Sequence, residues 1–125
     1  MTYEIITATP VTGALGAEIS GVDLSRPLDD RALFEIKLAF ADHLVLFFRG
    51  QNLTPEEQIS FATQLGPLLR VPYVEPLADH PDIIAVLKEA DECNISTFGG
   101  TWHTDFSFLE PPPAATLPYD RTSVV

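Results

Sequence analysis

The first amphipathic pattern along the chain predicts a helix over residues 30–42. Apolar side chains recur there at three- and four-residue steps, which is the spacing of a single stripe on a helix. The stripe consists of Leu33, Ile36 and Phe40. Glu35 and Lys37 fall outside it. Asp29 is suited to cap the N-terminus, and His43, just beyond the helix, is suited to act as a cation at its C-terminal end.

Clearer start and stop signals mark a second helix, which begins at Pro55. Thr54 is the expected N-cap, and Glu57 completes a capping box, in which side chain and backbone exchange hydrogen bonds. The pair Gly66-Pro67 is expected to end the helix. The apolar side of this helix is formed by Ile59, Ala62 and Leu65.

Short apolar or alternating runs predict strands before, between and after the helices. The predicted strands cover residues 4–8, 15–20, 44–48, 82–87 and 114–117. Pro10 is expected to break the first strand, and the continuous apolar run 44–48 is expected to be buried. The polar segment 88–98 is either a lid over the motif that follows it or an ordinary surface loop, and both interpretations stay open.

Composition limits the chain to one small domain, since it has 125 residues. Apolar residues make up 46%, which is enough for a core, while the net charge of −11 argues against nucleic acid or an anionic membrane surface as a partner. Cys93 is the single cysteine and cannot form an internal disulfide. The N-terminus does not resemble a signal peptide, and the longest apolar run is too short to span a membrane. We therefore expect a cytoplasmic protein.

The candidate chemistry lies in the segment 101–106, Thr-Trp-His-Thr-Asp-Phe. If the segment is extended, His103 and Asp105 point to the same side, about 6–7 Å apart. One histidine and one carboxylate form most of a facial triad, which leaves positions open for dioxygen on a non-haem Fe(II). The alternative is a hydrogen-bonded pair at the surface, because the two-residue pattern also arises by chance. Large apolar neighbours, among them Trp102 and Phe106, favour the metal site, since unpaired ionisable groups are costly beside them.

Four segments of the chain together resemble the taurine dioxygenase (TauD/TfdA) family. The stretch 99–116, which includes Trp-His-Thr-Asp and three consecutive prolines, is similar to the iron-binding segment of that family. Residues 13–28 resemble its opening motif, and residues 44–58 followed by 61–66 resemble its next blocks, in the same order. The resemblance runs from about residue 8 to residue 117. Ordered blocks of this kind are far more specific than His-x-Asp alone.

The resemblance implies an Fe(II)- and 2-oxoglutarate-dependent dioxygenase that uses O2 to hydroxylate a small organic acid, either a sulfonate or a carboxylate. His103 and Asp105 would be the catalytic metal ligands, with Trp102 and Phe106 supporting them beside the substrate. The implied fold is α+β or mainly β, a double-stranded β-helix (jelly roll) of the clavaminate synthase-like kind. Residues 1–125 would be the N-terminal part of one such domain, with the jelly roll incomplete. Self-association into a homo-oligomer is left open.

Some of the positions that this family uses fall outside the chain or differ in it. The resemblance places a second metal-binding histidine, a 2-oxoglutarate-binding arginine and a threonine downstream of residue 125, so we expect the 125 residues alone to be inactive. Val71 aligns with a histidine that helps to bind the sulfonate in the taurine enzyme, which makes taurine itself a doubtful substrate. The alternatives are a non-catalytic fragment or ligand-binding module on the same scaffold, and a cupin-type metal site that uses His43 or His80.

Overall fold

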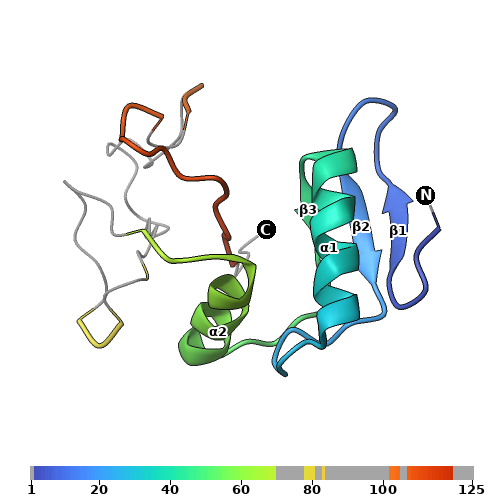
Figure 1. Ribbon diagram of the computed structural model, residues 1–125, viewed down its shortest axis with the longest axis horizontal. Helices are drawn as coiled ribbons and strands as arrows, with labels where there is room; N and C mark the ends of the chain where they lie inside the picture. Colours follow the sequence, from blue (N-terminus) through green and yellow to red (C-terminus); the bar gives the residue numbers. More distant parts are fainter. Residues whose placement is uncertain (1, 70–77, 81–82, 84–101, 105–106, 120–125) are drawn as a thin grey trace, which may run out of the picture. The chain divides into compact units, whose positions relative to one another are not determined.

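The computed structural model describes residues 2–69, 78–80, 83, 102–104 and 107–119. It divides into two units, Met1–Pro67 and Leu68–Val125, and each is described by itself. The helices and strands of the described residues all lie in the first unit (Figure 1). They are β1 (Thr7–Pro10), β2 (Ala17–Ser20), α1 (Asp30–His43), β3 (Leu46–Phe47) and α2 (Pro55–Leu65). None of the helices in the described part has the length and apolar composition needed to cross a membrane.

The three strands form one sheet in the order β1-β2-β3, with α1 lying against it (Figure 1). β1 and β2 are antiparallel, with Pro10 opposite Ala17, and β2 and β3 are parallel, with Ala17 opposite Leu46. The central strand is the best covered, because Ala17 and Ile19 are both almost fully buried. The predicted strand over residues 15–20 is confirmed over its last four residues.

Two glycines allow the tight turns at the ends of β2. Gly16 and Gly21 have φ values of +91° and +95°, a region that side-chain-bearing residues rarely adopt. A Cβ on Gly21 would also lie 2.8 Å from the carbonyl oxygen of Ile5. Glycine is therefore required there both for the backbone angle and for the close approach of the N-terminal segment.

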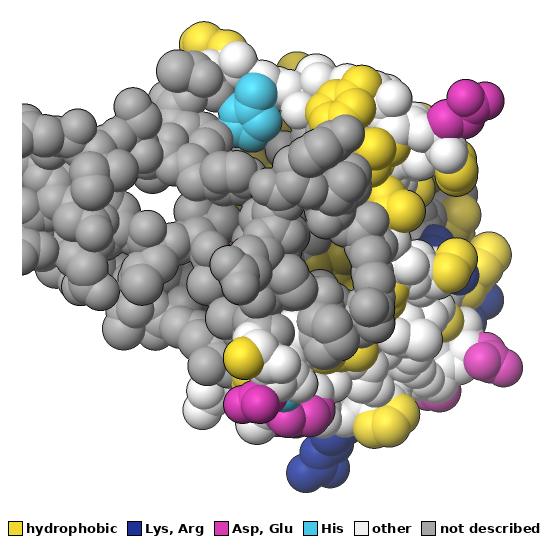
Figure 2. Space-filling model, turned by 90° about the vertical axis from the view of Figure 1, so that its left-hand side faces the viewer, with side chains coloured by type: hydrophobic (Ala, Val, Ile, Leu, Met, Phe, Trp, Pro, Cys, Tyr) yellow, Lys and Arg dark blue, Asp and Glu magenta, His cyan; other side chains and the backbone are white. Residues whose placement is uncertain are grey.

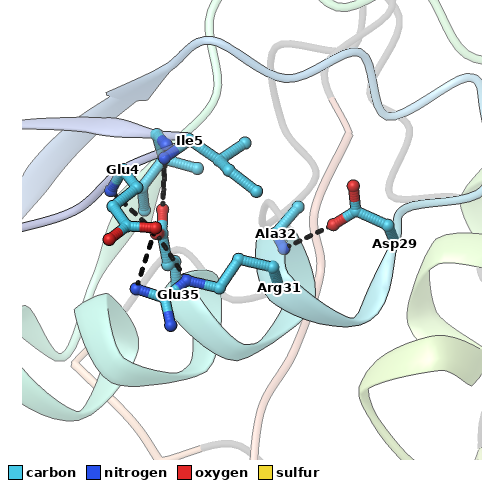
Figure 3. Close-up of polar contacts among 7 residues, drawn as sticks. Glu4, Ile5, Asp29, Arg31, Ala32 and Glu35 are labelled. Carbon is cyan, nitrogen blue, oxygen red and sulfur yellow. Dashed lines mark hydrogen bonds and ion pairs between the residues drawn. The ribbon is translucent and has the colours of Figure 1, made fainter.

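Glu35 is the one buried charged side chain among the described residues, and it holds the N-terminal segment against α1 (Figure 3). Its carboxylate accepts hydrogen bonds from the backbone N–H groups of Glu4, Ile5 and Ile6 at 2.8, 2.9 and 3.0 Å. The Nε atom of Arg31, one helical turn earlier, donates a fourth bond at 3.1 Å. The expectation that Glu35 falls outside the packed face of the helix is therefore wrong, because backbone donors make up for the loss of water.

The same contacts explain why the first strand is shifted from its predicted position. We predicted a strand over residues 4–8, but β1 begins at Thr7. The amides of residues 4–6 donate to Glu35 and not to a neighbouring strand. Pro10 does not break β1 but is its last residue, at a sheet edge where the missing N–H costs no ladder bond.

α1 confirms the predicted helix and its cap, but not its packed face. The Asp29 side chain accepts a hydrogen bond from the Ala32 N–H at 2.8 Å. The fully buried residues are Ala32, Glu35, Ile36 and Ala39. The predicted stripe is correct at Ile36, whereas Leu33 is only half-buried and Phe40 is exposed. The sheet thus contacts a face of α1 rotated from the one that hydrophobicity alone indicates, because small alanines allow close approach.

α1 ends in an unusual turn that leads directly into β3. Leu44 has φ +68° and ψ −32°, and its N–H still reaches the Phe40 carbonyl at 2.8 Å. The Val45 N–H bonds the His43 carbonyl at 2.8 Å, which makes Leu44 the centre of a three-residue γ-turn. The Gly16 N–H donates to the same His43 carbonyl at 2.8 Å. As predicted, His43 provides the basic group of the last helical turn.

β3 is shorter and more exposed than predicted. Only Leu46 and Phe47 lie in the strand, within the predicted run 44–48. Leu44, Val45 and Phe47 are 62%, 40% and 42% exposed, so the expectation of a buried strand is wrong. The physical reason is position, since β3 is an edge strand with β2 on one side only in the described part of the chain.

Two glutamines fasten the irregular bridge between β2 and α1. The Gln51 amide accepts from the Leu24 N–H at 2.9 Å and donates to the Val22 carbonyl at 3.1 Å. The Gln64 amide, on α2, does the same with both backbone groups of Leu28, at 3.3 and 3.1 Å. Each amide imitates a peptide partner, so a segment without secondary structure of its own keeps its hydrogen bonds satisfied.

α2 has the predicted start, end and capping box. The Thr54 hydroxyl accepts from the Glu57 N–H at 3.2 Å, and the Glu57 carboxylate accepts from the Thr54 N–H at 3.0 Å. Pro55 is the first residue of the helix and Gly66 is the C-cap. Phe61 is the one fully buried residue of α2, and it meets Phe48 edge-on at 5.8 Å between ring centroids. The predicted side of Ile59, Ala62 and Leu65 is half-buried.

The hydrogen bonds to Glu35 predict a specific dependence of stability on pH. Burial alone would raise the pKa of this carboxyl, but the amides of Ile6, Glu4 and Ile5 together with Arg31 lower it from 4.5 to about 2. The folded pKa lies below the unfolded one, so the stabilisation is complete above pH 4.5 and is lost as the pH falls toward 2. We expect Glu35→Gln to unfold at lower urea concentration at pH 7 and to lose less stability between pH 4.5 and 2.5 than the unsubstituted chain.

Urea titrations followed by circular dichroism at several pH values would measure this difference. Glu4→Gln is the matched control, because it removes an exposed carboxylate 3.5 Å from the same Arg31 guanidinium and should change the curves little. If Glu35→Gln and the unsubstituted chain lost the same free energy of unfolding between pH 4.5 and 2.5, the assigned role of Glu35 would be contradicted.

The capping box gives a second stability prediction. Thr54→Ala should lower the free energy of unfolding by about 1 kcal/mol, because it leaves the Glu57 N–H without its acceptor. Thr63→Ala makes the same change within α2, where the exposed hydroxyl only donates back to the Ile59 carbonyl. It should be nearly neutral. Equal losses for the two variants in urea unfolding would contradict the cap's contribution.

Candidate metal centre

The predicted metal-binding segment lies in the second unit and is described only in part. Trp102, His103 and Thr104 are described, all three are exposed, and none of them lies in a helix or strand. Asp105 and Phe106 lie outside the described residues, as does Val71. The convergence of His103 and Asp105 on one ion therefore stays a prediction.

The aromatic side chains around His103 do not form a packed shelter in the described part of the segment. Trp102 is fully exposed and Phe108 is 70% exposed. The supporting role expected for Trp102 likewise stays a prediction. His103 is exposed, so a metal ion can reach its imidazole from solvent.

A contact between two hydroxyls follows His103 directly. Thr104 Oγ1 and Ser107 Oγ are 2.7 Å apart, close enough for a hydrogen bond in which either group donates. Sequence reasoning did not single out this pair. The signal that was available is the three-residue spacing of two hydroxyl side chains, which is common in turns.

The chain after the motif differs from its prediction. Residues 107–119 are all described, and none of them lies in a helix or strand, so the predicted strand over 114–117 is wrong. Pro113 and Pro118 stand on either side of it, and a proline cannot donate to a strand ladder. The predicted strand 82–87 and the segment 88–98, including Cys93, fall largely or wholly outside the described residues.

The other two histidines lie in different places. His43 ends α1 in the first unit. His80 follows a turn at residues 78–79, and its carbonyl accepts from the Ile83 N–H at 3.0 Å. Within the described residues, no three histidine, cysteine, aspartate or glutamate side chains gather closely enough to hold a metal ion. The cupin-type alternative therefore gains no support from the part of the chain that is described.

The first unit has a hollow of about 330 Å³ beside the irregular bridge that follows β2. Its polar lining residues include Asp23, Gln51 and Asn52. The Asp23 carboxylate accepts from both the N–H and the hydroxyl of Ser25, which lowers its pKa, and Gln51 is bonded to the bridge. The side chains of Asp23 and Gln51 are thus already used in hydrogen bonds within the protein.

Comparison with known proteins shows relatives of this chain that the geometry of the His103 segment does not indicate. It is 39% identical over 108 residues to an alkylsulfatase of Acinetobacter baylyi, covering 86% of this chain and 32% of that protein. It is 38% identical over 109 residues to an alpha-ketoglutarate-dependent sulfate ester dioxygenase of Pseudomonas putida, covering 86% and 35%. The chain thus spans about a third of the length of these curated relatives.

A solved structure agrees with the sequence relationship. The chain is similar to a taurine dioxygenase from Burkholderia xenovorans, with a TM-score of 0.58 and 38% identity, and the match covers 62% of this chain and 28% of that one. The model of the family described as "Taurine catabolism dioxygenase TauD, TfdA family" matches residues 7–119, which include both the sheet and the His103 segment. The chain therefore belongs to the TauD, TfdA family.

Proposed function

We propose that the chain is part of a dioxygenase that uses Fe(II), 2-oxoglutarate and O2 to oxidise a small organic acid. The observation that carries this proposal is the family match, because it extends over residues 7–119, a range that includes His103 and Asp105. The relatives named above as a sulfate ester dioxygenase and an alkylsulfatase favour a sulfate ester or a sulfonate as the substrate class. Val71, where the taurine enzyme has a histidine, argues against taurine itself.

His103 and Asp105 are the proposed metal ligands. Imidazole and carboxylate are the donors that non-haem Fe(II) takes in a facial triad, and the exposed position of His103 leaves its ring accessible. Bound Fe(II) would supply the open positions at which 2-oxoglutarate and dioxygen react. The contribution of this chain would be to provide two of the protein ligands, with Trp102 and Phe106 supporting them.

The proposed architecture is a jelly roll of which this chain forms the first part. The three-stranded sheet with α1 against it would supply the opening strands, and residues 1–125 would belong to a single domain. The structural relative with a TM-score of 0.58 supports this assignment, since taurine dioxygenases have that fold. A cytoplasmic location and the absence of a nucleic-acid partner remain predictions from composition.

A non-catalytic role on the same scaffold is the second candidate. It is favoured by the share of the family that this chain covers, about a third of the length of the curated relatives. The resemblance to the family places the second histidine and the 2-oxoglutarate arginine downstream of residue 125. A two-ligand site should bind Fe(II) weakly, so measurements of metal binding and of turnover separate the two functions.

Metal titration tests the proposed ligands. Under anaerobic conditions, Fe(II) or Mn(II) should bind the chain with one saturable site, and His103→Ala or Asp105→Ala should weaken that binding about tenfold or more. His80→Ala and His43→Ala remove the same ring elsewhere and should leave the affinity unchanged. Isothermal titration calorimetry and Mn(II) electron paramagnetic resonance would measure the affinities, with circular dichroism as the check on folding.

The pattern of losses decides between the proposals. Unchanged binding in His103→Ala and Asp105→Ala would remove both residues from the site, and a loss confined to His43→Ala or His80→Ala would support the cupin-type alternative. Succinate formed from 2-oxoglutarate by the 125-residue chain would show that it is active alone, contrary to our expectation.

A further inference from the structure

Thr104 stands between the two proposed metal ligands in the sequence, and its side chain is tied to a second hydroxyl. It follows His103 directly and precedes Asp105 directly. Its Oγ1 atom lies 2.7 Å from Oγ of Ser107, within hydrogen-bonding distance. A fully extended chain would hold the Cα atoms of residues three apart about 10 Å from each other, so this bond forms only when the chain brings residues 104 and 107 together.

The backbone angles of Thr104 determine how far apart the two proposed ligands stand. Because each peptide group is planar, the distance between the Cα atoms of His103 and Asp105 depends only on φ and ψ of the residue between them. A facial triad needs its donors at set angles around the ion. A restraint on these two rotations therefore reduces the conformational entropy that is lost when a metal ion binds.

The side chain of Thr104 is suited to restrain its own backbone. Two heavy atoms on Cβ leave a threonine few χ1 rotamers, and which of them is allowed depends on φ and ψ. A hydroxyl held at 2.7 Å from its partner selects among these rotamers. The hydrogen bond to Ser107 thus acts through the side chain on the backbone that links the two proposed ligands.

We propose that Thr104 is a positioning residue for the proposed Fe(II) centre and that Ser107 holds it in place through the bond between their hydroxyls. This inference rests on the proposed function, which assigns His103 and Asp105 as ligands. The pair does not touch the metal in this scheme but limits the arrangements of the two ligands before the ion arrives. The two hydroxyls therefore act as a unit, and the loss of either should have the same consequence.

The metal-free chain tests the restraint itself. NMR coupling constants between Hα and Hβ of Thr104 report its χ1 angle. In the unsubstituted chain they should have the values of a single rotamer, and in Ser107→Ala they should move toward the average over several rotamers. An averaged coupling in the unsubstituted chain, or an unchanged coupling in Ser107→Ala, overturns the proposal.

Titration of the 125-residue chain with Mn(II), followed by electron paramagnetic resonance, tests the consequence for metal binding. Thr104→Val and Ser107→Ala should each weaken the binding about threefold or more, and the double variant should lose no more than either single variant. Thr104→Ser keeps the hydroxyl and should retain most of the affinity. Thr9→Val makes the same change at an exposed position of β1 and, as the matched control, should leave the affinity unchanged.

The acidic surface makes a control on weak metal binding elsewhere necessary. Figure 2 shows carboxylates of the described residues at separate places on one face, and the chain has a net charge of −11. Such groups attract divalent cations without a specific geometry. Salt at about 0.15 M screens this attraction, and excess Mg²⁺ occupies sites made of oxygen atoms alone, so the remaining Mn(II) binding reports a site that includes an imidazole.

The outcomes separate this inference from the proposed function. Mn(II) binding that is lost in His103→Ala but unchanged in Thr104→Val overturns the inference alone. Binding that does not depend on His103, or no saturable binding at all, overturns the proposed metal centre and the inference with it. Losses for Thr104→Val and Ser107→Ala that add up in the double variant also overturn the inference, because they would show that the two hydroxyls act separately.

Discussion

The buried carboxylate of Glu35 is the contact on which the first unit depends. A charge removed from water is tolerable only if strong partners replace the water, and three consecutive backbone amides and the Arg31 guanidinium do so here. These bonds fix residues 4–6 to α1 before β1 begins, so they set where β1 can pair with β2. The helix and the sheet are thus joined by a hydrogen-bonded anchor in addition to their apolar packing.

How well the sequence predicts this fold depends on how local each signal is. The capping box at Thr54, the cap at Asp29 and the strand before Gly21 depend on neighbours within a few residues, and all were predicted correctly. The burial of Glu35 depends on donors about thirty positions away, and nothing in the helix itself indicates them. The exposure of Phe47 in β3 was missed for a similar reason, because an apolar run does not show how many neighbours a strand has.

The candidate site shows the same limit in its chemistry. His103 and Asp105 could be singled out from residue types and spacing, since a histidine and a carboxylate are ligands that Fe(II) accepts. Their relative placement could not be predicted, because it depends on how the 101–106 segment is supported by other parts of a domain. The blocks that resemble the family in the first unit are different, since their residues have identifiable structural tasks: Gly21 permits a close approach, and Gln51 fastens a bridge.

The γ-turn at Leu44 makes the run Leu44-Val45-Leu46 less uniform than its hydropathy suggests. A positive φ is hardest for side chains branched at Cβ, because their second γ-atom meets the backbone. Valine or isoleucine would therefore be excluded from position 44 while remaining acceptable one residue later. Adjacent aliphatic positions in this run therefore tolerate different side chains, and the reason is the positive φ of the single residue Leu44.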